Sequence, residues 1–428
     1  MRRRDAANDR PKAVPPHDAA PGGADGTGAP DGQLAEPLRQ LAGQPLEVQQ
    51  RRGYADTLRE ICQQPATWRE TARDMVQQAP RLAAFLREAG VLDRRGSLIL
   101  TGSGSSLYVG ASVGPALQAA LGVPVDVVAA GDILTHPEQV LPPTRPRLAV
   151  SFARSGNSPE STAAVDLMLS RDPECRHLLV TCCRTGRLAT LFSDDPRVLP
   201  IMLNERTCDR SLVMTSSFTN MVIAASILGS LDDTGRYRER VAALSRAADH
   251  LLGRQVPPLA DLARRSFRTV VFLGVGCRFG GAREASLKVT EMSDGLVLSF
   301  AETYLGLRHG PMSAIREDTL VVCFLSSDPT ARAFEVDLVL ELNRKRLGAG
   351  KMLIGEAIPD DLAEEGDLLV ECPGMAALGD DNAAVLDVLA AQLLGFFRCL
   401  HLGLRPDSPS ASGVINRVVG PFTIHRES

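Results

Sequence analysis

"SLILTGSGSS", residues 97–106, joins an apolar run to a turn of glycines and serines. The run has the character of a buried strand, and the residues after it have the pattern of a helix. Three later segments repeat this arrangement: "VPVDVVAAG", "RLAVSFARSG" and "HLLVTCC". Short apolar strands that alternate with helices predict an α/β fold, a parallel sheet covered by helices on both faces.

The same pattern recurs further along the chain. "TVVFLGVG" (269–276) repeats "SLILTGSG" (97–104) at an offset of 172 residues. At the same offset "VVCFLSSD" aligns with the strand before Gly156, so that Phe152 matches Phe324 and Ser155 matches Ser327. Two separate strand–loop units repeat at the same offset of 172 residues, and this constant offset predicts a duplicated α/β domain.

The chain is therefore divided into five parts. We expect an N-terminal tail (1–35), a helical segment (36–92), two α/β domains (93–252 and 253–404) and a C-terminal tail (405–428), with the link between the copies near residues 253–258. Val14 is the one large apolar residue between Met1 and Leu34, so the first tail is predicted to be disordered. Trp68, within helical spacing, is predicted to anchor a core.

Composition excludes several classes of protein. The net charge of -4 and the aromatic content of 4% argue against a nucleic-acid binder. The apolar stretch Val385–Leu404 is interrupted by Asp387 and Arg398, which favours a buried helix over a membrane span. Nine scattered cysteines, without metal-ligand spacing and without a signal peptide, indicate reduced thiols. We expect a cytoplasmic protein with no nucleic-acid or membrane partner and no metal.

The glycine–serine turn does not fit a dinucleotide. The third glycine of a Gly-x-Gly-x-x-Gly motif is replaced by Leu107 in the first copy and by Phe279 in the second. What remains is a turn at a helix N-terminus with Gly104, Ser105 and Ser106, which suits a phosphate. A simple serine-capped turn is the alternative.

A second turn of this kind follows the next predicted strand. In "SFARSGNSPES" (151–161), Ser158-Pro159-Glu160 resembles a helix start, and Ser155 lies in the loop before it. Parallel strands bring both turns to one sheet edge, which favours a phosphate site there. Arg154 either assists or faces solvent. In the second copy Asp328 replaces Gly156 and would repel an anion, so we expect one phosphate site per chain.

The second copy carries charged residues at helical spacing. Glu284, Lys288 and Glu291 form one stripe, and spacing alone favours a solvated helix face with a Glu–Lys pair. His309, before Gly310-Pro311, is by itself typical of a turn residue.

Together the motifs resemble a known family. "GSGSS", "SFARSGNSPES", "REASLKVTE" and "LRHGP" are similar to the sugar isomerase (SIS) domain family. "TLREICQQPATWRET", "RSLVMTSSFTNM" and "PDSPSASGVINRVV" resemble, within it, the AgaS-type galactosamine-6-phosphate deaminase/isomerases. The resemblance runs from about Leu58 to near the C-terminus. It implies two tandem SIS domains, each a doubly wound parallel sheet.

The resemblance also implies roles for individual residues. The sugar phosphate is bound by four serines, Ser105, Ser106, Ser155 and Ser158. Thr215 and Ser216 contact the sugar. Glu291 is the base that moves a proton between C1 and C2, and His309 opens the ring, reaching in from a neighbouring subunit of a homo-oligomer.

Two positions depart from the related proteins. Arg417, a candidate substrate contact, stands where the related glucosamine-6-phosphate synthases have a lysine, and arginine cannot form an imine with a keto sugar. Cys208 stands where we expect asparagine in the AgaS type, which leaves the exact sugar open.

The expected reaction converts galactosamine 6-phosphate to tagatose 6-phosphate and ammonia without a cofactor. One alternative is a tagatose-6-phosphate ketose/aldose isomerase that releases no ammonia. The other is a sugar-phosphate sensor, which is disfavoured because the chain has no DNA-binding segment and keeps Glu291 and His309.

Overall fold

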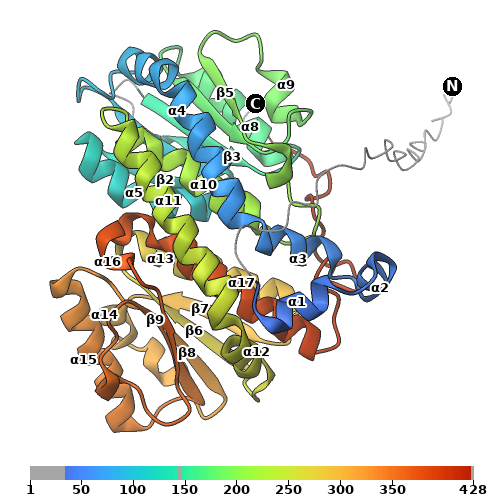
Figure 1. Ribbon diagram of the computed structural model, residues 1–428. Coiled ribbons are helices and arrows are strands. Elements are labelled where there is room, and N and C mark those ends of the chain that lie inside the picture. The colour runs from blue at the N-terminus through green and yellow to red at the C-terminus, as the bar shows by residue number, and fades with distance from the viewer. Residues whose placement is uncertain (1–33, 142–146, 426–428) are drawn as a thin grey trace, which may run out of the picture.

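The computed structural model describes residues 34–141 and 147–425. It contains two parallel five-stranded sheets, one in each of two lobes (Figure 1). The first sheet consists of β1 (Ser97–Gly102), β2 (Val125–Ala129), β3 (Arg147–Ala153), β4 (Arg176–Thr181) and β5 (Val198–Met202). The second consists of β6 (Thr269–Leu273), β7 (Leu298–Glu302), β8 (Thr319–Phe324), β9 (Gly350–Gly355) and β10 (Leu368–Glu371).

The strand order confirms the duplication. The first sheet has the order β2-β1-β3-β4-β5, and the second has the same order, β7-β6-β8-β9-β10. The first residues of β1 and β6, and those of β3 and β8, are both separated by 172 residues, as the sequence repeat predicts. The chain order reverses between β1 and β3 and again between β6 and β8. In doubly wound sheets the ligand crevice lies at this point, outside the carboxyl ends of the strands.

Helices cover both faces of the first sheet. A large core cluster lies between its inner face and α5 (Ser105–Leu121), α10 (Ser216–Ser226) and α4 (Gln64–Glu88). Two smaller clusters lie on the outer face under α6 (Ala130–Thr135), α8 (Pro159–Arg171) and α9 (Arg187–Leu191). A short α7 (Pro137–Val140) follows α6. Consequently α5 and α8, the helices after β1 and β3, lie on opposite faces of the sheet.

The second sheet follows the same plan. α13 (Gly276–Met292), α17 (Asp380–His401) and α12 (Val256–Arg264) cover its inner face and belong to the large core cluster. α14 (Tyr304–Leu307) and α15 (Pro329–Lys345) cover its outer face, and a short α16 (Met375–Leu378) precedes α17. The inner-face helices of both lobes therefore share one core between the sheets.

Helix α17 is the apolar segment that the sequence predicts to be buried. Among the described residues it is the one helix long and apolar enough to cross a membrane, and 94% of its most apolar window is buried within the protein. Its Asp387 accepts hydrogen bonds from the Arg278 guanidinium at 2.8 and 2.6 Å, and both side chains are fully buried. The prediction of a buried helix is confirmed.

The lobes meet where α13 crosses α5. Gly280 of α13 faces the backbone of α5, and a β-carbon on Gly280 would lie 2.4 Å from Ala111 C and Ser112 N. Gly281, its neighbour, faces Ala384 of α17. The glycine pair therefore lets α13 lie between a helix of the first lobe and the long helix of the second.

The segments outside the sheets differ in part from the predictions. The helical segment consists of α1 (Glu36–Ala42), α2 (Leu46–Arg52), α3 (Ala55–Cys62) and α4. Trp68 on α4 is fully buried and donates to Thr219 Oγ1 at 2.9 Å, which confirms it as a core anchor. The predicted disordered tail falls on residues 1–33, outside the described residues, apart from Leu34 and Ala35. Ala35 is buried and donates its N–H to Leu252 O, so the prediction of disorder is wrong for Ala35.

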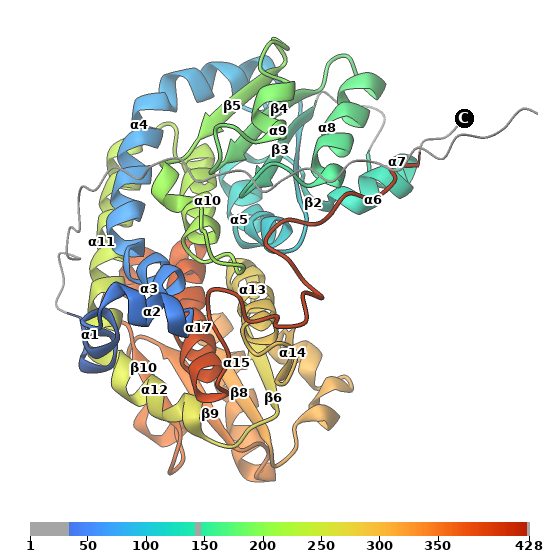
Figure 2. The ribbon, with the colours of Figure 1, turned by 90° about the vertical axis from the view of Figure 1, so that its right-hand side faces the viewer.

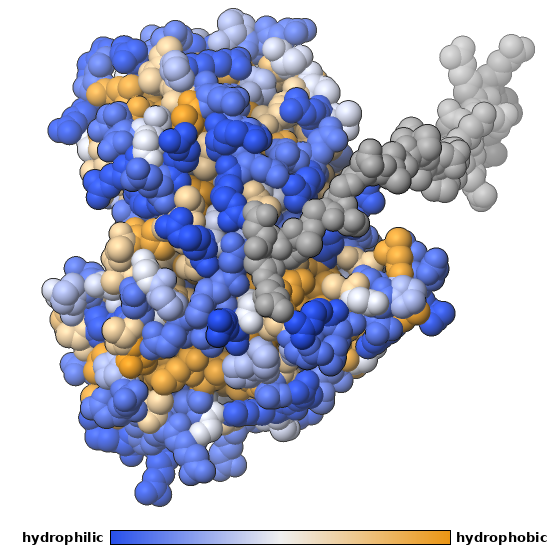
Figure 3. All heavy atoms as spheres, viewed as in Figure 1, coloured by the Kyte–Doolittle hydropathy of each residue, from blue (hydrophilic) through white to orange (hydrophobic). Residues whose placement is uncertain are grey.

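The link between the two copies is helical. α11 (Thr234–His250) continues through a π-helical turn (Leu251–Gln255) into α12 without a break. After α17 the segment 405–425 has no regular secondary structure; Figure 2 shows it passing α13 and ending beside α6 and α7. The face shown in Figure 3 is mainly hydrophilic, with small apolar patches, as expected when the inner-face helices bury most large apolar side chains. We propose that the domain boundaries lie where the sequence repeat sets them, at 93–252 and 253–404.

Gly280→Ala should destabilise the protein by about 1–3 kcal/mol because the new methyl group must displace the α5 backbone. Alanine is intrinsically the better helix former, so the loss would come from the helix crossing. Gly131→Ala on α6 is the matched control, since a β-carbon there meets nothing within 4 Å. Chemical denaturation measures both. A Gly280→Ala protein as stable as wild type would contradict the close crossing.

Candidate active site

The first glycine–serine turn lies at the carboxyl end of β1. A β-carbon on Gly102 would lie 2.6 Å from the backbone of Ser106, so the strand can turn this tightly into α5 only with glycine there. Gly104 occupies the N-cap position, and Ser105 and Ser106 begin the helix without any side-chain cap hydrogen bond. Both hydroxyl groups thus lie at the positive end of the helix dipole. Ser105 Oγ accepts a hydrogen bond from Lys288 Nζ, and Ser106 N–H is bonded within the turn.

The second turn follows β3, the strand beside β1. Ser158 is the N-cap residue of α8, as the sequence predicts, but its side chain makes no cap hydrogen bond. Ser155 accepts a hydrogen bond from Asn157 N at 3.3 Å within the loop. The alternative of simple serine-capped turns therefore receives no support, because neither helix uses these hydroxyl groups as caps.

Both turns line one cavity of about 400 Å³. The structure brings eight of the predicted residues to its wall: Gly104, Ser105, Ser106, Arg154, Ser155, Ser158, Glu291 and Arg417. Seven come from the first lobe and the C-terminal segment, and Glu291 comes from α13 of the second lobe. Residues of the C-terminal segment, among them Val414 and Gly420, complete the wall.

The charged stripe on α13 is buried between the lobes. Lys288 is fully buried, with its Nζ 2.5 Å from Glu291 Oε2, 3.3 Å from Glu284 Oε1 and 3.1 Å from Ser105 Oγ. The expectation of a solvated face, drawn from spacing alone, is wrong, because α13 packs against α5 and α17 along this stripe. Glu291 keeps 21% of its side chain exposed, facing the cavity.

Burial changes the pKa values of the charged side chains Glu284 and Lys288 on α13. It raises the pKa of Glu284 to about 7, against the opposing attraction of Lys288. For Lys288, burial acts to lower the pKa, but the carboxylates of Glu284 and Glu291 outweigh it and raise the pKa above its ordinary value. Lys288 is therefore a buried cation that orients Glu291 and contacts the first serine turn.

Two arginines add positive charge to the cavity wall. Arg154 is buried and donates to Leu212 O at 2.8 Å, to Ser211 O at 3.2 Å and to Arg417 O. Arg417 donates to Asp209 O at 2.8 and 2.6 Å. Both guanidinium groups thus bond to main-chain carbonyls. Of the two options for Arg154, the structure excludes the solvent-facing one.

Three predicted residues lie elsewhere. Thr215 and Ser216 do not line the cavity: they are fully buried at the start of α10, where Thr215 N and Ser216 Oγ donate to Asp209 at 2.7 and 2.5 Å. His309 is exposed in the turn after α14 and does not line the cavity of its own chain.

In the second lobe the equivalent crevice is filled by a side chain. Asp380 accepts hydrogen bonds from Ser327 N and Oγ at 2.9 Å and from Ser326 Oγ. Asp328 caps α15 through Thr330 N and Ala331 N. A carboxylate of the chain thus takes the place that an anion would have, which favours a phosphate site in the first lobe alone.

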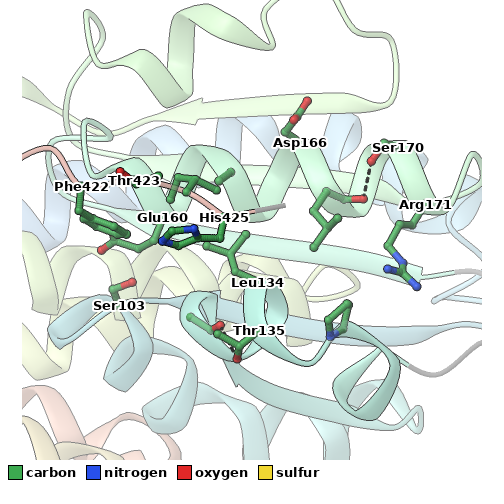
Figure 4. Close-up of a pocket in the computed structure, with 15 residues that line it drawn as sticks. Ser103, Leu134, Thr135, Glu160, Asp166, Ser170, Arg171, Phe422, Thr423 and His425 are labelled. Atoms are coloured by element: carbon green, nitrogen blue, oxygen red, sulfur yellow. Dashed lines mark hydrogen bonds between the residues drawn. The ribbon is translucent and has the colours of Figure 1, made fainter. Parts of the chain in front are cut away.

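A larger cavity of about 860 Å³ lies beside the first and shares Ser103 and Glu160 with it. It is bounded by α6, α8 and the end of the C-terminal segment, with Phe422 and His425 near Glu160 in Figure 4. Glu291 and the four predicted serines are absent from its wall, so the smaller cavity has the chemistry of the site.

From the sequence, Lys288 is expected to act only on its helix neighbour Glu291. Its spacing to Glu291 was visible, but its contact with Ser105, 183 residues away, depends on the helix crossing. Within the described ranges, no group of three or more His, Cys, Asp or Glu side chains could hold a metal ion. A reaction without a cofactor stays a prediction.

No protein-family model matches the chain. Individual proteins do. A candidate D-galactosamine-6-phosphate deaminase AgaS of Streptomyces coelicolor is 38% identical, over 86% of this chain and 95% of that protein. The D-galactosamine-6-phosphate deaminase AgaS of Escherichia coli is 34% identical over the same shares. The crystal structure of a candidate tagatose-6-phosphate ketose/aldose isomerase of Clostridium novyi superposes with a TM-score of 0.85 at 32% identity, over 90% of this chain and 99% of that one. With its two tandem SIS-type domains and the cavity between them, this chain belongs to the AgaS family.

Proposed function

We propose that the protein converts galactosamine 6-phosphate and water to tagatose 6-phosphate and ammonia. The observation that carries the proposal is the single cavity in which two serine turns of the first lobe face the Lys288–Glu291 pair of the second. An anion-binding end and a carboxylate base at the other end suit a sugar phosphate. The AgaS relatives are named for D-galactosamine 6-phosphate, and we take this amino sugar as the substrate for that reason.

The phosphate would bind between the two helix N-termini. Ser105, Ser106, Ser155 and Ser158 offer hydroxyl groups, and the positive ends of the α5 and α8 helix dipoles face the cavity. Arg154 and Arg417 lie on the same wall and add positive charge. The sugar chain then extends toward α13.

Glu291 would remove the proton from C2 of the open-chain amino sugar and return it to C1. The product of this shift is a C2 ketimine: the nitrogen on C2 loses one proton as the C=N bond forms, and O1 gains one, so that C1 becomes a hydroxymethyl group. Water adds to the C=N bond, and the C–N bond breaks to release ammonia and the ketose. Lys288 holds the carboxylate in place throughout, since its ammonium group is fixed by Glu284 and Ser105 as well.

His309 would serve the cavity of a second subunit. It is exposed in the turn after α14, the helix on which Leu305 exposes 47% of its surface. An exposed histidine that follows an exposed apolar side chain suits a subunit contact. We therefore propose a homo-oligomer in which His309 opens the sugar ring bound by the partner. All nine cysteines are free thiols, and we propose a cytoplasmic location for the enzyme.

Replacing Ser155 and Ser158 together with alanine should weaken sugar-phosphate binding by about 1–3 kcal/mol, the loss expected for donors to a charged group. Ser327→Ala, at the position equivalent to Ser155, is the matched control and should have little effect because Ser327 bonds to Asp380. Calorimetric titration measures both. Equal weakening by the two changes would contradict a single phosphate site.

Glu291→Gln should lower turnover by about 10²-fold or more and leave affinity near the wild-type value, because the shape is kept and the base is lost. His309→Ala should slow the cyclic substrate most. Co-expression of the two inactive chains should restore part of the activity if His309 acts across subunits. Mixed oligomers as inactive as their parents would place His309 outside the mechanism proposed for it.

Galactosamine 6-phosphate should release ammonia faster than its gluco epimer in a coupled assay, with tagatose 6-phosphate as the second product. Two relatives with solved structures are named for a tagatose-6-phosphate ketose/aldose isomerase, so tagatose 6-phosphate is also supplied alone. Conversion of tagatose 6-phosphate to an aldose, with no ammonia from either amino sugar, would show a simple isomerase instead.

A further inference from the structure

Residues 209–213 form a loop that holds both arginines of the cavity wall; we call it the arginine shelf. Its main-chain carbonyls at Asp209, Ser211 and Leu212 accept hydrogen bonds from Arg417 and Arg154. The shelf itself has no regular secondary structure. Its position must therefore be set by other contacts, and with it the position of the two guanidinium groups.

One contact comes from α3, outside both sheets. Glu60 is 1% exposed, and its Oε1 accepts hydrogen bonds from Arg210 N at 2.6 Å and Ser211 N at 3.3 Å. Its Oε2 lies within hydrogen-bond distance of Ser211 Oγ. We infer that Glu60 is a positioning residue of the active site: it fixes the arginine shelf and, through it, Arg154 and Arg417. This inference rests on the proposed function.

The hydrogen bonds indicate which form of Glu60 does this. Ser211 Oγ also lies 3.1 Å from Val213 O, and a hydroxyl group has one proton to donate. An ionised Glu60 and Val213 O would compete for that proton. A protonated Glu60 donates to Ser211 Oγ, which then donates to Val213 O, so both bonds form.

The charges around Glu60 agree with this. Burial first, and then the Asp209 carboxylate, raise the pKa of Glu60 to about 8. The hydrogen bonds from Ser211 and Arg210 N oppose this shift of the pKa, and so does Arg59 of α3, with Nη2 at 3.6 Å from Glu60 Oε1, but they do not outweigh it. The side chains of α10 that contact Asp209 belong to Ser216 and Ser217 and are neutral. Above about pH 8, Glu60 would carry a charge beside Asp209 and weaken the shelf.

The test compares three variants with wild type. Glu60→Ala should raise the KM for galactosamine 6-phosphate roughly tenfold or more, with a smaller change in kcat, because the cations move while Glu291 stays. Glu60→Gln should keep the wild-type KM near neutral pH, since its amide accepts from the shelf N–H groups and donates to Ser211 Oγ. Glu335→Ala is the matched control: Glu335 is also a buried glutamate that accepts a backbone N–H, from Ser326 at 2.7 Å, but lies in the second lobe. It should lower stability and leave KM unchanged.

The pH profile separates positioning from folding. Above about pH 8 the wild-type KM should rise relative to that of Glu60→Gln, which has no proton to lose. Dividing the wild-type KM by the KM of Glu60→Gln at each pH cancels the effect of any ionisation of the substrate itself. If Glu60→Ala is insoluble, this ratio and Ser211→Ala, which should also raise KM, decide the question. A constant ratio, or an unchanged KM in Glu60→Ala, would overturn the inference.

Titration with inorganic phosphate keeps the two proposals apart. Loss of phosphate binding in Glu60→Ala, with no turnover of any sugar phosphate by wild type, would support the shelf and reject the proposed reaction. Turnover by wild type with equal phosphate affinity in Glu60→Ala would reject the shelf alone.

Discussion

The buried ammonium of Lys288 is the interaction on which the site depends. It lies among two carboxylates of its own helix and the hydroxyl group of Ser105, the first residue of a helix in the other lobe. A buried cation without such partners would be costly, so the contact requires α13 and α5 to stay in register. Gly280 allows the two helix backbones to approach closely enough for this. The interface between the lobes and the candidate active site are therefore the same structure.

The duplicated domain has two equivalent crevices, one at the carboxyl ends of β1 and β3 and one at those of β6 and β8. Different groups occupy them. In the first, serine hydroxyl groups and helix N-termini face an open cavity. In the second, Ser326 and Ser327 are bonded to Asp380, and Arg278 is paired with Asp387. The second copy contributes its helix α13 in place of a second anion site. This division explains why the proposed base and the proposed phosphate-binding turns come from different lobes.

The segments outside the two sheets complete the cavity. The C-terminal segment forms part of its wall and brings Arg417 to the arginine shelf. The start of that segment is fixed by α3, where Thr57 N and Oγ1 donate to Asp407 at 2.7 and 2.8 Å. α3 therefore holds both the shelf, through Glu60, and the segment that crosses it. Helix α3 thus contacts two segments of the cavity wall that lie outside the sheets.

The sequence by itself determined the α/β class, the duplication and the two serine turns, because strand periodicity, glycine turns and a constant repeat offset are local signals. It also placed Trp68 in a core and α17 inside the protein. It misjudged the Glu284–Lys288–Glu291 stripe, since the spacing of charges on a helix is the same whether that face meets water or another helix. It could not show that Thr215 and Ser216 face Asp209, or that Asp380 fills the second crevice. Those facts depend on contacts between residues far apart in the chain, and only the packing of α13 against α5 decided that Lys288 and Glu284 are buried while Glu291 lines the cavity.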